Sequence, residues 1–157
     1  MVPALVIFII GGYAAFNYQR ERKFLKKQQQ DNFLINAELK SYEKLKEAMA
    51  SLCSTEKNWL KTDTNRKKQI AEINKNISTI IMNLNLSERN DFCKFIIFVA
   101  EKIENAKLST QDEVNELLNY VEVQEDQCIK ILHKKFLIIK NKRYKKEKAG
   151  GNEEDES

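Results

Sequence analysis

The stretch IAEINKNISTIIMNL, residues 70–84, decides the fold of this chain. Its apolar residues recur in alternating steps of three and four, at Ile70, Ile73, Ile77, Ile80 and Leu84. This spacing is typical of a helix that packs one face against neighbouring helices. The stretch therefore predicts an amphipathic helix within an all-α bundle.

Glycine and proline are almost absent from the chain. Pro3, Gly11, Gly12, Gly150 and Gly151 are the only ones, so the 137 residues from 13 to 149 contain neither. Glycine supplies the positive φ angles and close backbone approaches of phosphate-binding loops, nucleophile elbows and tight hairpins. The sequence therefore lacks a Walker loop, a dinucleotide fingerprint and a GxSxG elbow, and it predicts helices joined by short polar turns.

Around residues 70–84 the pattern predicts about four antiparallel helices, two long and two short, in a coiled-coil-like domain. The first long helix ends near residue 58, before the turn KTDTN at residues 61–65, and its apolar rhythm is interrupted by Glu38 and Glu56. Short connections favour antiparallel neighbours, so the two short helices should pack against the membrane-distal half of the two long ones.

Polar residues mark the starts of the last two helices. Ser87 is placed to cap the third helix, which should reach about residue 106. Ser109 or Thr110, followed by Asp112 or Glu113, predicts a capping box for the fourth helix, which should continue to about residue 148.

The N-terminal segment is apolar and then abruptly basic. Residues 2–18 carry no charged side chain, and seventeen residues of helix span about 26 Å, against about 30 Å for a hydrocarbon core. Five basic residues follow at once: Arg20, Arg22, Lys23, Lys26 and Lys27. Because such a cluster resists translocation, we expect a single uncleaved transmembrane anchor, with the domain on the cytosolic or matrix side. Cleavage near Ala14, as in a secretory signal, and burial within a complex are the alternatives.

Gly11 and Ala15 lie four residues apart in this segment. A small-xxx-small pair lets a second transmembrane helix approach closely, which makes the two residues candidates for transmembrane helix packing. Small residues are also ordinary in short anchors.

Composition divides the chain into four parts. We expect a transmembrane anchor at residues 1–19, a basic juxtamembrane helix at 20–34, a helical bundle at 35–148 and a disordered acidic tail at 149–157. Charge is segregated along this order, since residues 101–127 hold eight acids and two lysines, whereas residues 134–148 hold eight bases and one glutamate.

The basic end of the fourth helix is a second candidate for membrane-surface contact. It comprises Lys140, Lys142, Arg143, Lys145 and Lys146. Together with the basic residues after the anchor, these side chains would bind anionic lipid head groups. Complementarity to the helix dipole is the alternative explanation. Nucleic acid is a poor candidate partner, because the bases are confined to one helix end beside an acidic tail.

Chemistry-bearing residues are few. Cys53, Cys93, Cys128 and His133 could in principle form a Cys3His zinc site, but no two cysteines have CxxC spacing and each is expected on a different helix. Reduced thiols in a helical interior are the simpler interpretation. The sequence predicts no cofactor, no metal site and no catalytic residue, hence no enzyme.

The order of features resembles that of the small mitochondrial outer-membrane import receptors: an anchor with IIGGYAAFNY, a basic flank RERKFLKK, a helical domain and an acidic end EEDES. The resemblance covers the plan of the chain and favours a mitochondrial membrane. Those receptors carry a tetratricopeptide helix pair with glycine at set positions, which residues 13–149 lack, so no binding residue is transferred.

Two main functions fit these observations. The first is a single-pass structural or assembly subunit of a membrane complex, which packs against other subunits without catalysis. Its candidate partner-packing residues are Phe95, Ile96, Phe98 and Val99, from the run FCKFIIFVA. The alternative is a membrane-tethered adaptor or receptor whose self-contained bundle recruits a soluble partner. A secreted helical carrier would instead require cleavage near Ala14.

Overall fold

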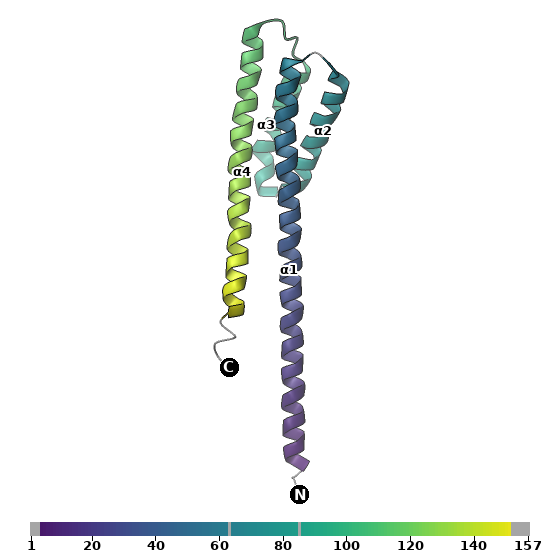
Figure 1. The fold of residues 1–157 in the computed structure, drawn as a ribbon, viewed down its shortest axis with the longest axis vertical. Helices are drawn as coiled ribbons and strands as arrows, with labels where there is room; N and C mark the ends of the chain where they lie inside the picture. The colour runs from purple at the N-terminus through teal and green to yellow at the C-terminus, as the bar shows by residue number, and fades with distance from the viewer. Residues whose placement is uncertain (1–3, 63, 85, 152–157) are drawn as a thin grey trace. The chain divides into compact units, whose positions relative to one another are not determined.

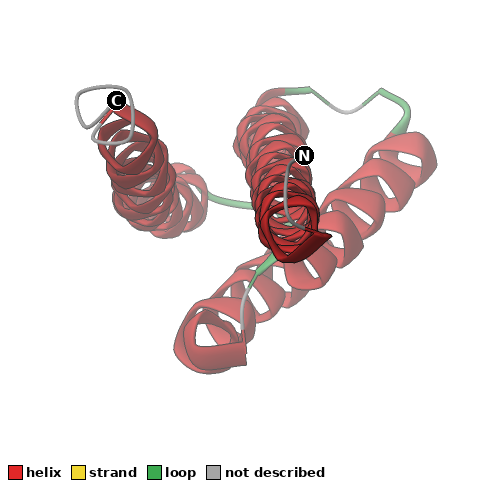
Figure 2. Ribbon diagram, turned by 90° about the horizontal axis from the view of Figure 1, so that it is seen from below, coloured by secondary structure: helices red, strands yellow, loops and turns green. Residues whose placement is uncertain are grey.

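The computed structural model describes residues 4–62, 64–84 and 86–151 of the chain, without the side chains of residues 4–11, 86–90 and 151. Within these residues every regular element is an α-helix, and short loops connect the helices (Figure 2). The predicted all-α helical bundle is confirmed.

Two long and two short helices follow one another along the chain (Figure 1). Helix α1, Ala4–Lys61, has 58 residues and α4, Gln111–Gly151, has 41. Between them lie α2, Arg66–Asn83, with 18 residues and α3, Leu86–Glu104, with 19. From the C-terminal half of α1 onward, each helix runs antiparallel to the one before it (Figure 1). Helix α4 includes residues 149–151, the start of the predicted acidic tail, whose remaining residues lie outside the described part.

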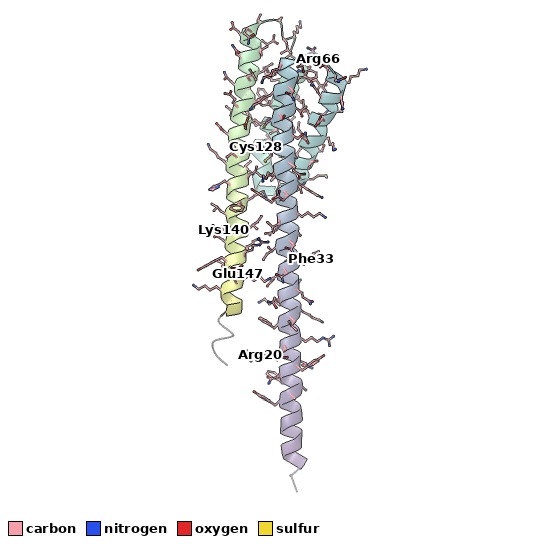
Figure 3. The ribbon with its side chains drawn as sticks, viewed as in Figure 1. Arg20, Phe33, Arg66, Cys128, Lys140 and Glu147 are labelled. Carbon is pink, nitrogen blue, oxygen red and sulfur yellow. The ribbon has the colours of Figure 1, made fainter. Side chains whose placement is uncertain are left out.

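The chain divides into two compact units, residues 1–38 and residues 39–157. The first unit is the N-terminal part of α1 and exposes most of its large apolar side chains, including Phe33, which Figure 3 labels: Tyr13, Phe16, Tyr18, Phe24, Leu25, Phe33 and Leu34. The second unit holds the rest of α1 together with α2, α3 and α4, and it contains the hydrophobic core.

No helix among the described residues has a stretch of the length and hydrophobicity needed to cross a membrane. The transmembrane anchor predicted at residues 1–19 is therefore not supported by the structure. Residues 1–3 of that segment and the burial of Gly11 lie outside the described part, whereas Ala15, the predicted packing partner of Gly11, is exposed.

The core of the second unit draws apolar side chains from all four helices. Helix α2 and its C-cap residue Leu84 contribute the predicted row, in which Ile73, Ile77, Ile80 and Leu84 are buried and Ile70 is partly buried. Opposite this row, α1 contributes Leu45, Met49 and Leu52, α3 contributes Ile96, Val99 and Ile103, and α4 contributes Leu117 and Val121. Burial of this apolar surface is the main force that holds the helices together.

Polar side chains set the register of α1 against α2. Asn76 Nδ2 donates a hydrogen bond to Ser51 Oγ at 2.9 Å, and Ser41 Oγ donates to Asn83 Oδ1 at 3.0 Å. Asn76 is buried, so its bond to Ser51 offsets part of the cost of removing its amide from water.

Two non-glycine residues have positive φ angles in the connecting loops. Asn65, directly before α2, has φ 62°, a conformation that asparagine tolerates better than most residues. Leu108, between α3 and α4, has φ 50°, which is unusual for leucine, and its side chain packs against the core. Apolar contact thus holds the second turn in a conformation that a glycine would adopt without strain.

The predicted capping box at the start of α4 is formed by Thr110 and Glu113. The Glu113 backbone N–H donates to Thr110 Oγ1 at 3.3 Å, and Glu113 Oε2 accepts from the Ser109 backbone N–H at 3.0 Å. For the third helix, α3 begins at Leu86, so Ser87 lies within its first turn, and the Ser87 side chain is outside the described part.

Candidate functional site

A groove of about 470 Å³ separates the C-terminal part of α1 from the middle of α4, both in the second unit. From α1, its lining residues recur every three or four positions between residues 46 and 61, so they share one face of that helix. The floor is mainly apolar: Met49, Ala50, Cys53, Cys128, Ile129 and Leu132. Hereafter this feature is called the α1–α4 groove.

The rim of the α1–α4 groove is positively charged. Lys46, Lys57 and Lys61 line it, with Glu125 as the only acidic lining residue. Lys57 forms an ion pair with Glu125 that joins α1 to α4. Its hydrogen bond to Glu125 raises the pKa of Lys57 and keeps it charged. Neither Lys46 nor Lys61 forms an ion pair with a described residue, so the groove carries a net positive charge.

Beside the groove, a polar cluster is buried between α1 and α4. Gln124 and Glu56 are both fully buried, and Gln124 Nε2 donates to Glu56 Oε2 at 2.7 Å. Gln124 Nε2 also donates to Cys53 Sγ, at 3.4 Å. The other oxygens of Glu56 and Gln124, Oε1 in each, have no hydrogen-bond partner among the described residues. The cluster therefore satisfies only part of its hydrogen-bonding capacity.

Burial is the main cause of the shifted pKa of Glu56. Removal of the carboxylate from water raises its pKa to about 8, and the hydrogen bond from Gln124 opposes this rise only in part. Glu56 is thus mostly a neutral acid at pH 7, which avoids an unpaired charge in the interior.

The two thiols on the groove floor differ in acidity. Interaction with the Cys128 thiol, together with the hydrogen bond from Gln124, lowers the pKa of Cys53 to about 7. Interaction with Cys53 and burial raise the pKa of Cys128. Cys53 is thus the more readily ionised of the pair.

The predicted membrane-surface residues lie on the surface of their own units. Arg20, which Figure 3 labels, and its four basic neighbours are exposed on the N-terminal part of α1. On α4, Lys140, Lys142, Arg143 and Lys145 are exposed, and Lys146 is partly exposed. Their surface positions permit contact with anionic head groups.

The four predicted partner-packing residues fall on two sides of α3. Ile96 and Val99 are fully buried in the core, so a partner surface here would consist of Phe98, at 39% exposure, with Phe95 beside it. The Phe98 ring packs edge-on against Tyr120 at 5.5 Å between centroids. Phe98 also lines a groove of about 450 Å³ between α3 and α4, next to three acidic residues: Glu101, Glu113 and Glu116.

The cysteines and the histidine do not assemble into one site. Cys93, on α3, is buried away from the groove lining, and His133 is exposed. Among the described residues, no group of three or more His, Cys, Asp or Glu side chains is arranged to hold a metal ion.

Neither Gln124 nor Lys57 stands out in the sequence, and Glu56 is visible there only as a break in the apolar rhythm of α1. An acidic residue at a core-facing position was the available indication, because such a residue must be paired, neutralised or moved to the surface. Which partner it would meet on α4 depends on tertiary packing.

Comparisons of the chain with models of known protein families, with curated proteins and with solved structures gave no match.

Proposed function

We propose that this chain is a non-catalytic, membrane-tethered adaptor whose helical domain binds an acidic amphipathic helix of a protein partner in the α1–α4 groove. The observation that carries the proposal is the combination of an apolar floor and a lysine rim in that groove.

The floor of the groove suits the apolar face of a helix. Met49, Ala50, Ile129 and Leu132 come from two neighbouring helices, and Ile129 is 59% exposed. An amphipathic helix inserts side chains at intervals of three and four residues into such a groove, where each finds apolar contacts on both sides. Methionine adapts its shape to the inserted side chain.

The charge of the rim selects the partner. Lys57 is already engaged by Glu125, so Lys46 and Lys61 supply the positive charge available to a ligand. Acidic residues flanking the apolar face of a partner helix would pair with these lysines, raise the association rate and disfavour basic helices.

Attachment to a membrane is part of the proposal and is supported by sequence composition. The run without charge from residue 2 to residue 18, followed by five bases within residues 20–27, is typical of a short anchor with its C-terminal side in the cytosol or the matrix. Alkaline carbonate extraction of membranes from the source cells tests it, because an anchored chain stays in the pellet.

A structural subunit of a membrane complex is the second candidate. Helix α4 exposes large apolar side chains beyond the groove, at Phe136, Leu137 and Ile138, each more than 40% exposed. Large apolar side chains that are exposed close together on one helix are typical of a surface that packs against another subunit. A structural subunit would co-migrate with one large assembly in native detergent gels, whereas an adaptor would bind its partner reversibly.

Photo-crosslinking tests the adaptor function directly. A photo-reactive amino acid replaces Ala50 in the groove, or the exposed Lys44 outside it, in the full chain expressed in the source cells. We expect a discrete adduct from position 50 only, whose cross-linked peptide is an acidic amphipathic helix. Combined charge reversal, Lys46→Glu with Lys61→Glu, should abolish the adduct, whereas Lys44→Glu should not.

Equal adducts from positions 50 and 44, or an adduct that survives reversal of both groove lysines, would contradict the proposed binding mode.

A further inference from the structure

Two thiols from different helices meet on the floor of the α1–α4 groove. Cys53 of α1 is 5% exposed and Cys128 of α4 is 4% exposed, and both line the groove. Each is a free thiol, and the two sulfurs come from helices that face each other across the same groove. Figure 3 labels Cys128 on the part of α4 that also carries Glu125, the ion-pair partner of Lys57 on α1. The groove thus brings a pair of thiols, each with a small exposed surface, to one lining.

The surroundings assign different roles to the two sulfurs. Cys53 Sγ accepts a hydrogen bond from Gln124 Nε2 at 3.4 Å, whereas no hydrogen bond to Cys128 from a third side chain is found among the described residues. A donor to the sulfur stabilises the thiolate, which is the nucleophile in thiol chemistry. Interaction with Cys128 and with Gln124 accordingly lowers the pKa of Cys53 to about 7, whereas interaction with Cys53 and burial raise the pKa of Cys128. Cys53 is therefore the attacking thiol and Cys128 the second to react.

The lysine rim favours an anionic reagent. Lys46 and Lys61 flank the floor that holds both cysteines, and the single acid, Glu125, is neutralised by Lys57. A disulfide that carries carboxylates is attracted to such a rim, whereas a neutral disulfide is not.

We propose that Cys53 is a modification site for an anionic low-molecular-weight disulfide, and that Cys128 resolves the mixed disulfide to form a bond between α1 and α4. In the first step the Cys53 thiolate attacks one sulfur of the reagent RSSR, which forms Cys53–S–SR and releases RS⁻. In the second step Cys128 loses its proton and its sulfur attacks Cys53 Sγ, which releases the second RS⁻. The two protons of the protein thiols end on the two released thiols, so the protein loses two electrons and RSSR is reduced to two RSH.

The test uses the full-length reduced chain in mild detergent, treated with oxidised glutathione as the anionic probe and with hydroxyethyl disulfide as the neutral one. Intact mass and peptide mapping after alkylation follow the products. We expect the wild type to lose two hydrogens and to form the Cys53–Cys128 link reversibly. Cys128→Ser, or Cys128→Ala if the serine variant is unfolded, should stop at a mixed disulfide on Cys53. Cys53→Ser should stay unmodified.

Matched controls separate the groove chemistry from general unfolding. Cys93→Ser should react like the wild type, because Cys93 is buried outside the groove. Lys46→Glu with Lys61→Glu should slow the reaction with oxidised glutathione several-fold but leave the reaction with hydroxyethyl disulfide unchanged. The proposal is overturned if Cys93 reacts as fast as Cys53, if Cys128 is the first sulfur modified, or if the mixed disulfide persists in the wild type. The readout involves no protein partner, so it is independent of the proposed adaptor function.

Discussion

At position 56 a glutamate occupies a place in α1 where the helix rhythm calls for an apolar residue. Its side chain is fully buried, and the one strong partner is the Gln124 amide at 2.7 Å. A charged carboxylate there would have no positive partner among the described residues to offset its loss of hydration, so burial favours the protonated form and raises the pKa of Glu56 to about 8. Buried polar pairs of this kind fix which helix faces meet more than they add to stability.

This pKa makes the stability of the fold depend on pH. An unfolded chain releases the Glu56 proton near pH 4.5, but the folded chain retains it up to about pH 8. Between these values the unfolded state binds fewer protons, so the free energy of unfolding should fall as pH rises. The contribution of neutral Glu56 to the free energy of unfolding is fully present below pH 4.5 and is lost above about pH 8.

Glu56→Gln should remove most of this dependence, because glutamine keeps the shape and the acceptor but does not ionise. At pH 8.5 we expect the variant to be more stable than the wild type by about 1–3 kcal/mol, on the scale of a relieved buried charge. Urea denaturation of the full chain from pH 5 to pH 9 measures the effect. The exposed Glu43→Gln serves as the control, and a wild-type profile that is flat or rises over this range would refute the assignment.

The elements differ in what makes them start and stay helical. Helix α4 is capped by Thr110, whose hydroxyl accepts from the Glu113 backbone N–H, and the Glu113 carboxylate accepts from the backbone N–H of Ser109 in the preceding loop. Hydrogen bonds from the backbone, first from Ser109, lower the pKa of Glu113. Helix α2 starts after Asn65 without a side-chain cap, so its stability depends on the buried apolar row.

Loss of the α4 cap should therefore be measurable. Thr110→Ala removes the acceptor for the Glu113 backbone N–H and should destabilise the domain by about 0.5–2 kcal/mol. Chemical denaturation at pH 7 measures the effect of Thr110→Ala on the free energy of unfolding. Because folding lowers the pKa of Glu113, this residue stabilises the folded domain above pH 4.5, and the stabilisation is lost as the pH falls through the pKa of the folded state. Thr64→Ala, in an exposed loop, is the control and should have no comparable effect.

Alanine substitutions in α2 should lower the free energy of unfolding only at the buried positions of its apolar row. Ile80 is 0% exposed, and Ile80→Ala should cost about 2–5 kcal/mol through lost burial and the cavity that it leaves. Met82, on the same helix, is 73% exposed, and Met82→Ala should stay within about 0.5 kcal/mol. Similar losses of unfolding free energy for the two variants would show that α2 does not pack as described.

At the scale of the whole molecule, the chain consists of a unit of residues 1–38 and a unit of residues 39–157. Among the described residues, the hydrophobic core lies in the second unit, and its first α1 contributions are the Ser41 hydrogen bond to α2 and the buried Leu45. The groove, the thiol pair and the buried Glu56 all belong to this second unit.

A fragment of residues 39–157 should therefore fold without the preceding unit. We expect a monomer that melts cooperatively, with a midpoint within about 4 °C of the full chain, the shift that about 1 kcal/mol produces. Circular dichroism and sedimentation measure this. A fragment of residues 54–157, which lacks Leu45, Met49 and Leu52, should not fold. If the longer fragment is also unfolded or associates through its core, the division into units has no energetic meaning.

The sequence by itself determined the helices. The three-four spacing of Ile73, Ile77, Ile80 and Leu84 predicted α2, and the absence of glycine and proline from residues 13–149 predicted an all-helical chain. The capping box at Thr110 was likewise local, because a cap depends on residues three positions apart. Periodicity also marked the apolar run of α3 but could not say which of its residues remain exposed, since Ile96 and Val99 are buried whereas Phe98 is not.

Only the tertiary structure decided the site. Glu56 and Gln124 are 68 positions apart, and Cys53 and Cys128 are still farther apart in the chain, yet α1 and α4 bring the first pair into contact and place the second pair in one groove. Spacing along a helix determines which residues share a face, but the contact between two faces depends on the order, length and register of all four helices. For that reason Glu56 is only an interruption of the apolar pattern in the sequence, whereas in the fold it accepts a hydrogen bond from the Gln124 amide.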